Sequence, residues 1–312
     1  MIAGRLPGKR PSVSERVTVL PRPCVLLNPI PPQHLQESKR LVPTVILLSF
    51  NSKDTIERTI RSALEVSPAI YVVDSGSTDG TVEIAEAAGA KVMQHPFENY
   101  GAQRNWAIAA VPQEYGWQLH LDADEYLTPS LIAEIKALPE QSEIAGYTLP
   151  RYLTFMGRLL RHNLAPTYHM RLFRNGMGAC EARHYDQHFL CTGTVGQLQH
   201  EMIDDIRMSL SEWTRRHNNW ADAEVKELLS KEREGRVAGK FFGTAIERKR
   251  YLRGIYDKVP LFVRPFLLFV YRYVLKAGFL DGVPGFIFCI LQTFWFRFLV
   301  DAKLYEARKA NR

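Results

Sequence analysis

Cysteine is scarce in this chain. Its 312 residues include only Cys24, Cys180, Cys191 and Cys289, and no two of them stand in Cys-x-x-Cys spacing. This absence excludes the common zinc-binding and thioredoxin-like patterns, so we expect free thiols in a reducing cytosol. Residues 1–20 also lack an apolar core segment, so we expect no signal peptide.

A glycine-rich nucleotide loop is missing as well. Gly76 and Gly80 do not form Gly-x-Gly-x-x-Gly, and residues 49–53, which follow the first expected strand, contain no glycine. The first absence disfavours a dinucleotide site. The second disfavours a sugar-phosphate nucleotidyltransferase, which needs a glycine-rich basic loop at that point.

Negative charge is scarce at both ends of the chain. The net charge is +5 over residues 1–40, −8 over residues 41–230 and +10 over residues 231–312. An acidic middle argues against a nucleic-acid binder, whose basic surface accompanies its main fold. The distribution suits an enzyme whose C-terminal part rests on anionic lipid.

Short strand and helix patterns alternate through the first half of the chain. Apolar runs at 45–48, 69–73 and 91–94 and an alternating pattern at 117–121 predict strands, separated by helical patterns at 56–64, 81–88 and 99–110. This alternation with short loops predicts an α/β fold with a parallel sheet.

Polar side chains follow three of these strands. Ser49 and Asn51 follow the first, Asp74 ends the second, and Asp122 and Asp124 follow the strand at 117–121. Ligands of open α/β sheets bind beyond the carboxyl ends of the strands, so we expect one shared cleft. Asp74 is suited to accept a base N–H, although a role as a helix cap or turn residue explains it equally well.

The acidic cluster contains three carboxylates in four residues. Asp122, Asp124 and Glu125 repel one another unless a cation lies among them. Mg²⁺ or Mn²⁺ suits all-oxygen ligands, and a nucleotide diphosphate would complete the coordination shell. The alternative is a solvated acidic loop.

Four segments in sequence resemble the family-two glycosyltransferases of the GT-A fold, which has a Rossmann-like nucleotide-binding sheet. They are residues 45–51, 73–81, 99–105 and 121–125, and the similarity extends over residues 42–225. The resemblance is to enzymes of lipopolysaccharide-core and exopolysaccharide synthesis. It implies that Asp74 binds uracil, Arg104 lies by the nucleotide, Asp124 binds the metal, and Asp122 faces the ribose or a metal-bound water.

The resemblance also implies an inverting, metal-dependent transfer from a UDP-linked sugar to a hydroxyl of a lipid-linked or cell-envelope glycan. Such a reaction needs a carboxylate as general base, for which Asp186 is the first candidate and Glu181 the second. Many relatives have His-Glu where this chain has residues 186–187. His184 and His188 fit structural or substrate contacts better than metal binding. His200 is either a nitrogen ligand of the metal or a core histidine.

Two other functions fit parts of the sequence. A polyprenyl-phosphate sugar transferase shares the fold, and its phosphate acceptor needs no base. A sugar-phosphate nucleotidyltransferase is disfavoured by the missing glycine loop.

The chain divides into a disordered or extended leader at 1–41, a GT-A catalytic domain at 42–205 and a helical C-terminal region at 206–312. Within that region, segment 259–300 is rich in Phe and Leu, but its uncharged run at 283–296 is shorter than the roughly 20 residues that span a bilayer. Arg264, Arg272 and Lys276 lie near Phe262 and Phe266, a pattern typical of an interfacial helix. We expect peripheral binding to the cytoplasmic face of an inner membrane; a buried helical hairpin is the alternative.

Overall fold

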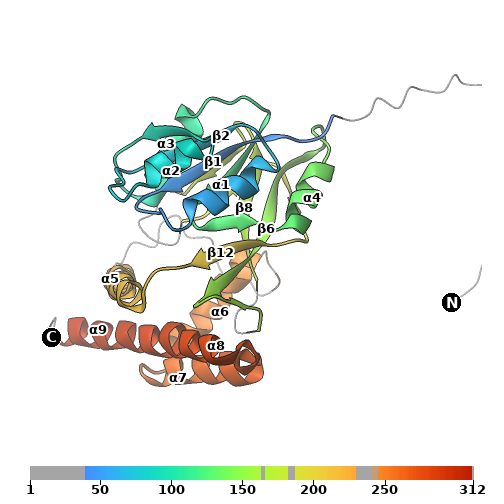
Figure 1. Ribbon diagram of the computed structural model, residues 1–312. Coiled ribbons are helices and arrows are strands. Elements are labelled where there is room, and N and C mark those ends of the chain that lie inside the picture. The colour runs from blue at the N-terminus through green and yellow to red at the C-terminus, as the bar shows by residue number, and fades with distance from the viewer. Residues whose placement is uncertain (1–38, 163–165, 182–186, 230–241, 243–244, 311–312) are drawn as a thin grey trace, which may run out of the picture. The chain divides into compact units, whose positions relative to one another are not determined.

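The computed structural model describes residues 39–162, 166–181, 187–229, 242 and 245–310 (Figure 1). These described residues belong to one compact unit. Most of the expected leader and the first candidate base, Asp186, lie outside the described residues, and so does His184.

Ten strands form one mixed sheet in the order β3-β2-β1-β4-β8-β6-β12-β5, with β7 and β11 also paired to β6. Strands β3, β2, β1 and β4 run parallel, and β8 joins β4 antiparallel. The predicted α/β fold is therefore confirmed. The strands of this sheet are β1 (Pro43–Ser49), β2 (Ile70–Asp74), β3 (Lys91–Gln94), β4 (Trp117–Asp122), β5 (Glu125–Leu127), β6 (Ile144–Phe155), β7 (Arg158–Leu160), β8 (Thr167–Arg174), β11 (Thr194–Gln197) and β12 (Met202–Ile206).

A two-stranded sheet and a series of helices complete the described chain. The small sheet pairs β9 (Gly178–Cys180) with β10 (Phe189–Cys191). The helices are α1 (Ile56–Leu64), α2 (Thr81–Ala87), α3 (Tyr100–Ala110), α4 (Pro129–Ala137), α5 (Leu210–Leu229), α6 (Ala245–Lys258), α7 (Val263–Val270), η1 (Tyr271–Leu275), η2 (Gly278–Asp281), α8 (Gly282–Phe288), η3 (Cys289–Trp295) and α9 (Phe296–Ala310).

The central strand β1 is buried on both faces, as its continuous apolar run predicts. Val45 and Leu47 pack with side chains of α1, α2 and α4, whereas Ile46 and Leu48 pack with side chains of α3. Helices therefore cover both sides of the parallel strands and leave the carboxyl ends of these strands as the place for a site.

Helix α5 joins the sheet to the C-terminal helices through an aromatic seam. The ring of His217 stacks on Trp213 at 3.4 Å, and its Nε2 lies 2.8 Å from the amide of Gln292 in η3. Trp213 also contacts Phe155 of β6, with 6.3 Å between ring centroids. The seam thus packs on both the main sheet and the C-terminal helices.

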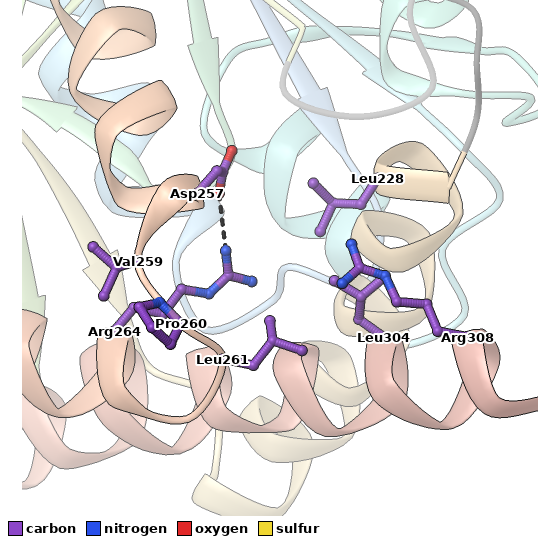
Figure 2. A pocket seen from close by; sticks show the side chains of 8 residues that line it. All are labelled: Leu228, Asp257, Val259, Pro260, Leu261, Arg264, Leu304 and Arg308. Carbon is purple, nitrogen blue, oxygen red and sulfur yellow. Dashed lines mark hydrogen bonds and ion pairs between the residues drawn. The ribbon is translucent and has the colours of Figure 1, made fainter.

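The structure corrects the predicted strip of membrane-facing cations. Arg264 is buried, and its Nε donates to Asp301 Oδ1 at 2.8 Å. Figure 2 shows Arg264 beside a small cavity of about 240 Å³, where it also pairs with Asp257. Because its charge is neutralised inside the protein, Arg264 is not available to lipid; of the three cations, only Lys276 is exposed.

The last helical stretch is longer than the uncharged run suggests. Residues Gly278–Ala310 form a continuous helical stretch that is long and apolar enough, by length and composition, to cross a membrane. The uncharged run at 283–296 is only part of a longer apolar segment, which a single arginine, Arg297, interrupts.

We predict that Asp301→Asn destabilises the protein by about 3–5 kcal/mol, because it removes the buried counter-charge of the Arg264 guanidinium and leaves only the partly exposed Asp257 beside it. Asp222→Asn is a matched control: Asp222 is half exposed and pairs with Lys303 on the surface, so its loss costs less than about 1 kcal/mol. Urea unfolding of both variants measures the difference. Equal losses would contradict the importance of the buried pair.

Candidate active site

The carboxyl ends of the parallel strands meet as the sequence predicts. Ser49 of β1 lies beside Asp74 of β2, and β4 ends on the other side of β1 at Asp122. Asn51 follows β1 with a positive φ of 47°, and its side-chain oxygen accepts the N–H of Thr78 at 2.9 Å. Polar groups from three strand ends therefore share the edge where open α/β sheets bind ligands.

Asp74, which the resemblance assigns to uracil, is fully buried. Its Oδ2 accepts the hydroxyls of Ser49 (2.7 Å) and Ser77 (2.6 Å), and its Oδ1 accepts the N–H groups of Gly76 (3.0 Å) and Ser77 (2.8 Å). Burial opposes ionisation, but these hydrogen bonds hold the pKa of Asp74 below its usual value. These hydrogen bonds fit the alternative that the sequence left open, in which Asp74 stabilises the turn after β2.

Asp204 of β12 adds a fourth carboxylate to the three at the end of β4 and the start of β5. Residues 123 and 124 turn the chain into β5, and β12 pairs with β5 so that Asp204 stands opposite Glu125. The N–H of Asp205 donates to the carbonyl of Asp124 at 2.8 Å, which fixes β12 beside this turn. Asp204 does not stand out in the sequence, because it lies on a distant strand. Its only signal is a pair of acids inside the apolar run 202–206.

Two arginines hold Asp122. Arg104 Nη2 donates to its Oδ1 at 2.6 Å, and Arg171 Nη2 donates to its Oδ2 at 3.0 Å, so both oxygens are engaged. Burial opposes ionisation, but the two guanidinium groups outweigh burial and keep the pKa of Asp122 well below its usual value. Asp122 is therefore an ionised residue in a fixed position.

Glu125 is completely buried within the same network. Its Oε1 accepts Arg171 Nη2 at 2.6 Å, and its Oε2 accepts the N–H of Asp122 at 3.0 Å. Arg151 Nη1 lies 3.5 Å from Glu125 Oε1 and 3.2 Å from Asp204 Oδ2. Buried charges are tolerated only when they are paired in this way.

Asp124 and Asp204 retain the least compensated negative charge. Burial, followed by the charges of Asp204, Asp122 and Glu125, raises the pKa of Asp124 well above its usual value. Burial, partly opposed by Arg151, raises the pKa of Asp204 to about 6. A divalent cation between the two would relieve this repulsion. Within the described ranges no three ligating side chains are grouped to hold a metal alone, so a bound ligand would have to supply further oxygens.

Arg104 projects from α3 toward these carboxylates. The Asn99 side chain accepts the N–H of Ala102 at 2.9 Å and so caps the helix. The Arg104 guanidinium lies 4.9 Å from the ring centre of Phe189. Its Nη1 is buried and has no hydrogen-bond partner in the part of the chain that the structure describes. An unused buried guanidinium N–H suits a phosphate oxygen.

Glu181, the second candidate base, lies against the same helix. The Asn105 side chain donates to the Cys180 carbonyl at 2.9 Å and accepts its N–H at 2.8 Å. A Cβ on Gly101 would come within 2.6 Å of the Glu181 carbonyl, so glycine permits this close approach. The Glu181 carboxylate accepts the N–H of His188 at 3.2 Å. The backbone at Cys180 and Glu181 is thereby held against α3, the helix that carries Arg104.

His200 is exposed and pairs with α4, so it is not the core histidine that the sequence offered as one alternative. Its ring Nδ1 is 2.9 Å from Glu134 of α4, which also accepts the N–H of His200 at 2.9 Å. The pairing with Glu134 instead ties the turn before β12 to α4.

Comparison with known proteins places these residues in a family. The model named "Glycosyl transferase family 2" matches residues 44–197. An uncharacterized glycosyltransferase of Rickettsia bellii is 36% identical over 117 residues, covering 38% of this chain and 37% of that protein. This chain therefore spans little more than a third of the Rickettsia relative.

Two further similarities extend over more of the chain. The lipopolysaccharide core biosynthesis glycosyltransferase LpsC of Rhizobium meliloti is 24% identical over 273 residues, covering 84% of this chain and 92% of LpsC. The crystal structure of S. aureus TarS 1–349 with UDP-GlcNAc is 14% identical, with a TM-score of 0.43 and coverage of 86% of this chain and 92% of that one. Residues 44–197 therefore form a domain of glycosyltransferase family 2.

Proposed function

We propose that this protein is a metal-dependent inverting glycosyltransferase. It moves a sugar from a nucleotide-sugar, UDP-linked, to a hydroxyl of a lipid-linked or cell-envelope glycan. The observation that carries this proposal is the poorly compensated pair Asp124 and Asp204 next to Arg104, at the carboxyl edge of the sheet. A divalent ion and the diphosphate of a nucleotide match these charges.

Asp124 and Asp204 are the residues that would hold Mg²⁺ or Mn²⁺. Both are partly buried carboxylates, and hard divalent ions prefer oxygen ligands. The bound ion would offset the charge that develops on the leaving diphosphate. Asp122 keeps its place between Arg104 and Arg171, facing the ribose or a metal-bound water rather than supplying the main metal contact.

The nucleotide would lie along the ends of β1 and β2. Ser49, Asn51 and Asp74 line this edge, and Arg104 offers its unused Nη1 to the diphosphate. A uracil N–H at Asp74 would have to replace one of the four donors that now occupy its oxygens. Exposed Asn51 is the more accessible base contact.

The general base is a carboxylate of the segment at 181–186. The Glu181 carbonyl lies against Gly101 of α3, and Asp186 lies farther along that segment, outside the described residues. Either would accept the proton of the acceptor hydroxyl as its oxygen attacks the sugar carbon. Inversion follows from one in-line displacement. The similarity to LpsC over 84% of the chain supports an acceptor of the lipopolysaccharide-core type.

A lipid-linked acceptor accords with the C-terminal helices. Large apolar side chains are exposed along α7, η1, η2 and α8, and we call them the apolar C-terminal surface: Phe262, Val263, Phe266, Leu267, Tyr271, Val274, Leu275, Phe279, Leu280, Val283 and Phe286. An apolar surface of this extent marks a membrane or protein contact. We propose that it rests on the cytoplasmic face of an inner membrane.

The long helical stretch is attached to the catalytic domain near its start and to α5 toward its end, which favours lying on the membrane over crossing it. Near its start, Asp281 accepts the N–H groups of Arg161 and His162, both at 3.1 Å. Toward its end, Phe296, Val300 and Leu304 pack against α5. A helix that spans the bilayer would have to give up these contacts.

We predict that the purified protein releases UDP from a UDP-sugar only with Mn²⁺ or Mg²⁺. Asp124→Ala and Asp204→Asn should abolish transfer and weaken UDP binding only when the ion is present, because they remove the oxygens that bind it. A panel of nucleotide sugars, with titration of UDP with and without Mn²⁺, measures both effects; Asp222→Asn on the α5 surface is the control. Full activity in EDTA would refute the metal proposal.

Loss of the base should reduce turnover without reducing donor affinity. We expect Glu181→Gln or Asp186→Asn to slow transfer by about 10²-fold or more, the usual value of general-base help. UDP affinity should persist, since the base faces the acceptor. Single-turnover rates identify which residue acts; if neither substitution slows the reaction, the base lies elsewhere.

Membrane binding should depend on the apolar C-terminal surface. Changing Phe266, Leu267 and Leu275 together to Glu should release the protein from anionic vesicles, because these side chains are at least half exposed. Leu64→Glu, at an exposed site on α1, is the control. Flotation with vesicles measures attachment. An unmodified protein that stays soluble with vesicles at low salt would show that the surface serves another contact.

A further inference from the structure

A cavity of about 780 Å³ lies on the face of β12 opposite the acidic cluster. Successive residues of a strand point to opposite faces, so Asp204 faces the candidate active site while Asp205 faces this cavity. Its walls come from α1, from the β6–β7 hairpin and from residues 205–210 between β12 and α5. The volume is in the range of sites for small molecules, roughly 300–1,000 Å³.

One wall of the cavity carries excess positive charge. Arg58 Nη1 and Arg207 Nε both contact Asp205 Oδ2, at 3.0 and 2.8 Å, while Thr154 donates its hydroxyl to Asp205 Oδ1. Two guanidinium groups on one carboxylate leave one net positive charge. Arg207 Nη1 also donates to the Asp54 carbonyl at 3.1 Å, but each arginine side chain is 47% exposed, so each offers further N–H groups to a ligand. This wall therefore suits an anion with several oxygens.

The opposite wall is apolar and has no open aromatic face. Phe155 is buried, and Arg58 covers the ring of Tyr126 at 3.5 Å, so neither ring is open for stacking on a nucleobase. Met156 is 53% exposed although it sits in a turn with a φ of 50°, and Leu210 is 40% exposed at the rim. Flexible aliphatic side chains of this kind suit an alkyl chain better than a planar ring.

The cavity adjoins the helices that carry the apolar C-terminal surface. Phe155 of the cavity wall contacts Phe288 of α8, with 5.2 Å between ring centroids. The same helix exposes Val283 and Phe286. A lipid in the cavity would therefore lie next to the element that we propose to rest on the membrane.

We propose that this cavity binds a phospholipid with an anionic headgroup. Its phosphate lies on Arg58 and Arg207, and its acyl chains lie along Met156, Met208 and Leu210. This site is separate from the sugar-transfer site, and its binding does not require transfer. The proposal thus goes beyond the enzymatic function and can fail without affecting it.

The test uses the intact protein and monomeric dihexanoyl phosphatidylglycerol, kept below its micelle concentration and titrated by calorimetry. We expect saturable binding that weakens about tenfold or more in Arg207→Gln and in Arg58→Gln, because each loses charge-assisted hydrogen bonds. Arg61→Gln is the matched control: Arg61 lies on the same helix, is exposed and pairs with Glu57. Its binding should equal that of the unmodified protein.

Two further ligands distinguish an anionic-lipid site from a simple phosphate site and from a site for acyl chains alone. Glycerol 3-phosphate carries the anion without chains, and dihexanoyl phosphatidylcholine carries the chains without net headgroup charge; both should bind at least about tenfold more weakly. Equal binding of glycerol 3-phosphate would show a simple phosphate site and overturn the lipid proposal. Equal binding of phosphatidylcholine, or unchanged binding in Arg58→Gln and Arg207→Gln, would overturn the role of the arginines. Thermal unfolding checks that each variant is folded.

Discussion

The ion pairs of Arg171 are the interaction on which the candidate active site depends. This buried guanidinium lies 3.0 Å from Asp122 and 2.6 Å from Glu125, and so it joins the end of β4 to the start of β5 from the neighbouring strand β8. Without it, two carboxylates would be buried with too little positive charge nearby, which costs several kcal/mol. The sheet can therefore hold four acids together because β8, β6 and α3 bring arginines to them.

The arginines neutralise two of the four carboxylates and leave the other two available to bind a cation. Asp122 and Glu125 are held by hydrogen bonds from arginine and backbone, whereas Asp124 and Asp204 face each other's charge with only Arg151 close to Asp204. A site built in this way gains most from a cation that binds together with an anionic ligand. The same principle operates in the C-terminal region, where Arg264 is neutralised by Asp301 inside the helices and the outer surface is left to apolar side chains.

The regular part of the fold could be predicted because its signals are local. The apolar run at 45–48, the alternation at 117–121 and the helical spacing at 99–110 each reflect burial within one element. The meeting of Ser49, Asp74 and Asp122 followed from the geometry of parallel strands and was also predictable. The assignments that changed involve distant partners: His200 is engaged by Glu134, and Arg264 by Asp301. Sequence spacing carries no information on such pairs.

The sequence by itself determined the α/β class, the edge of the sheet that carries the site, and the acidic turn after β4, since these depend on residue periodicity and on which residues follow each strand. Only the tertiary structure decided how the charges are shared. The pairing of β12 with β5 places Asp204 opposite Glu125, and the pairing of β8 with β4 brings Arg171 to Asp122. These contacts join residues far apart in the chain through strand register, and register arises from the packing of the whole sheet.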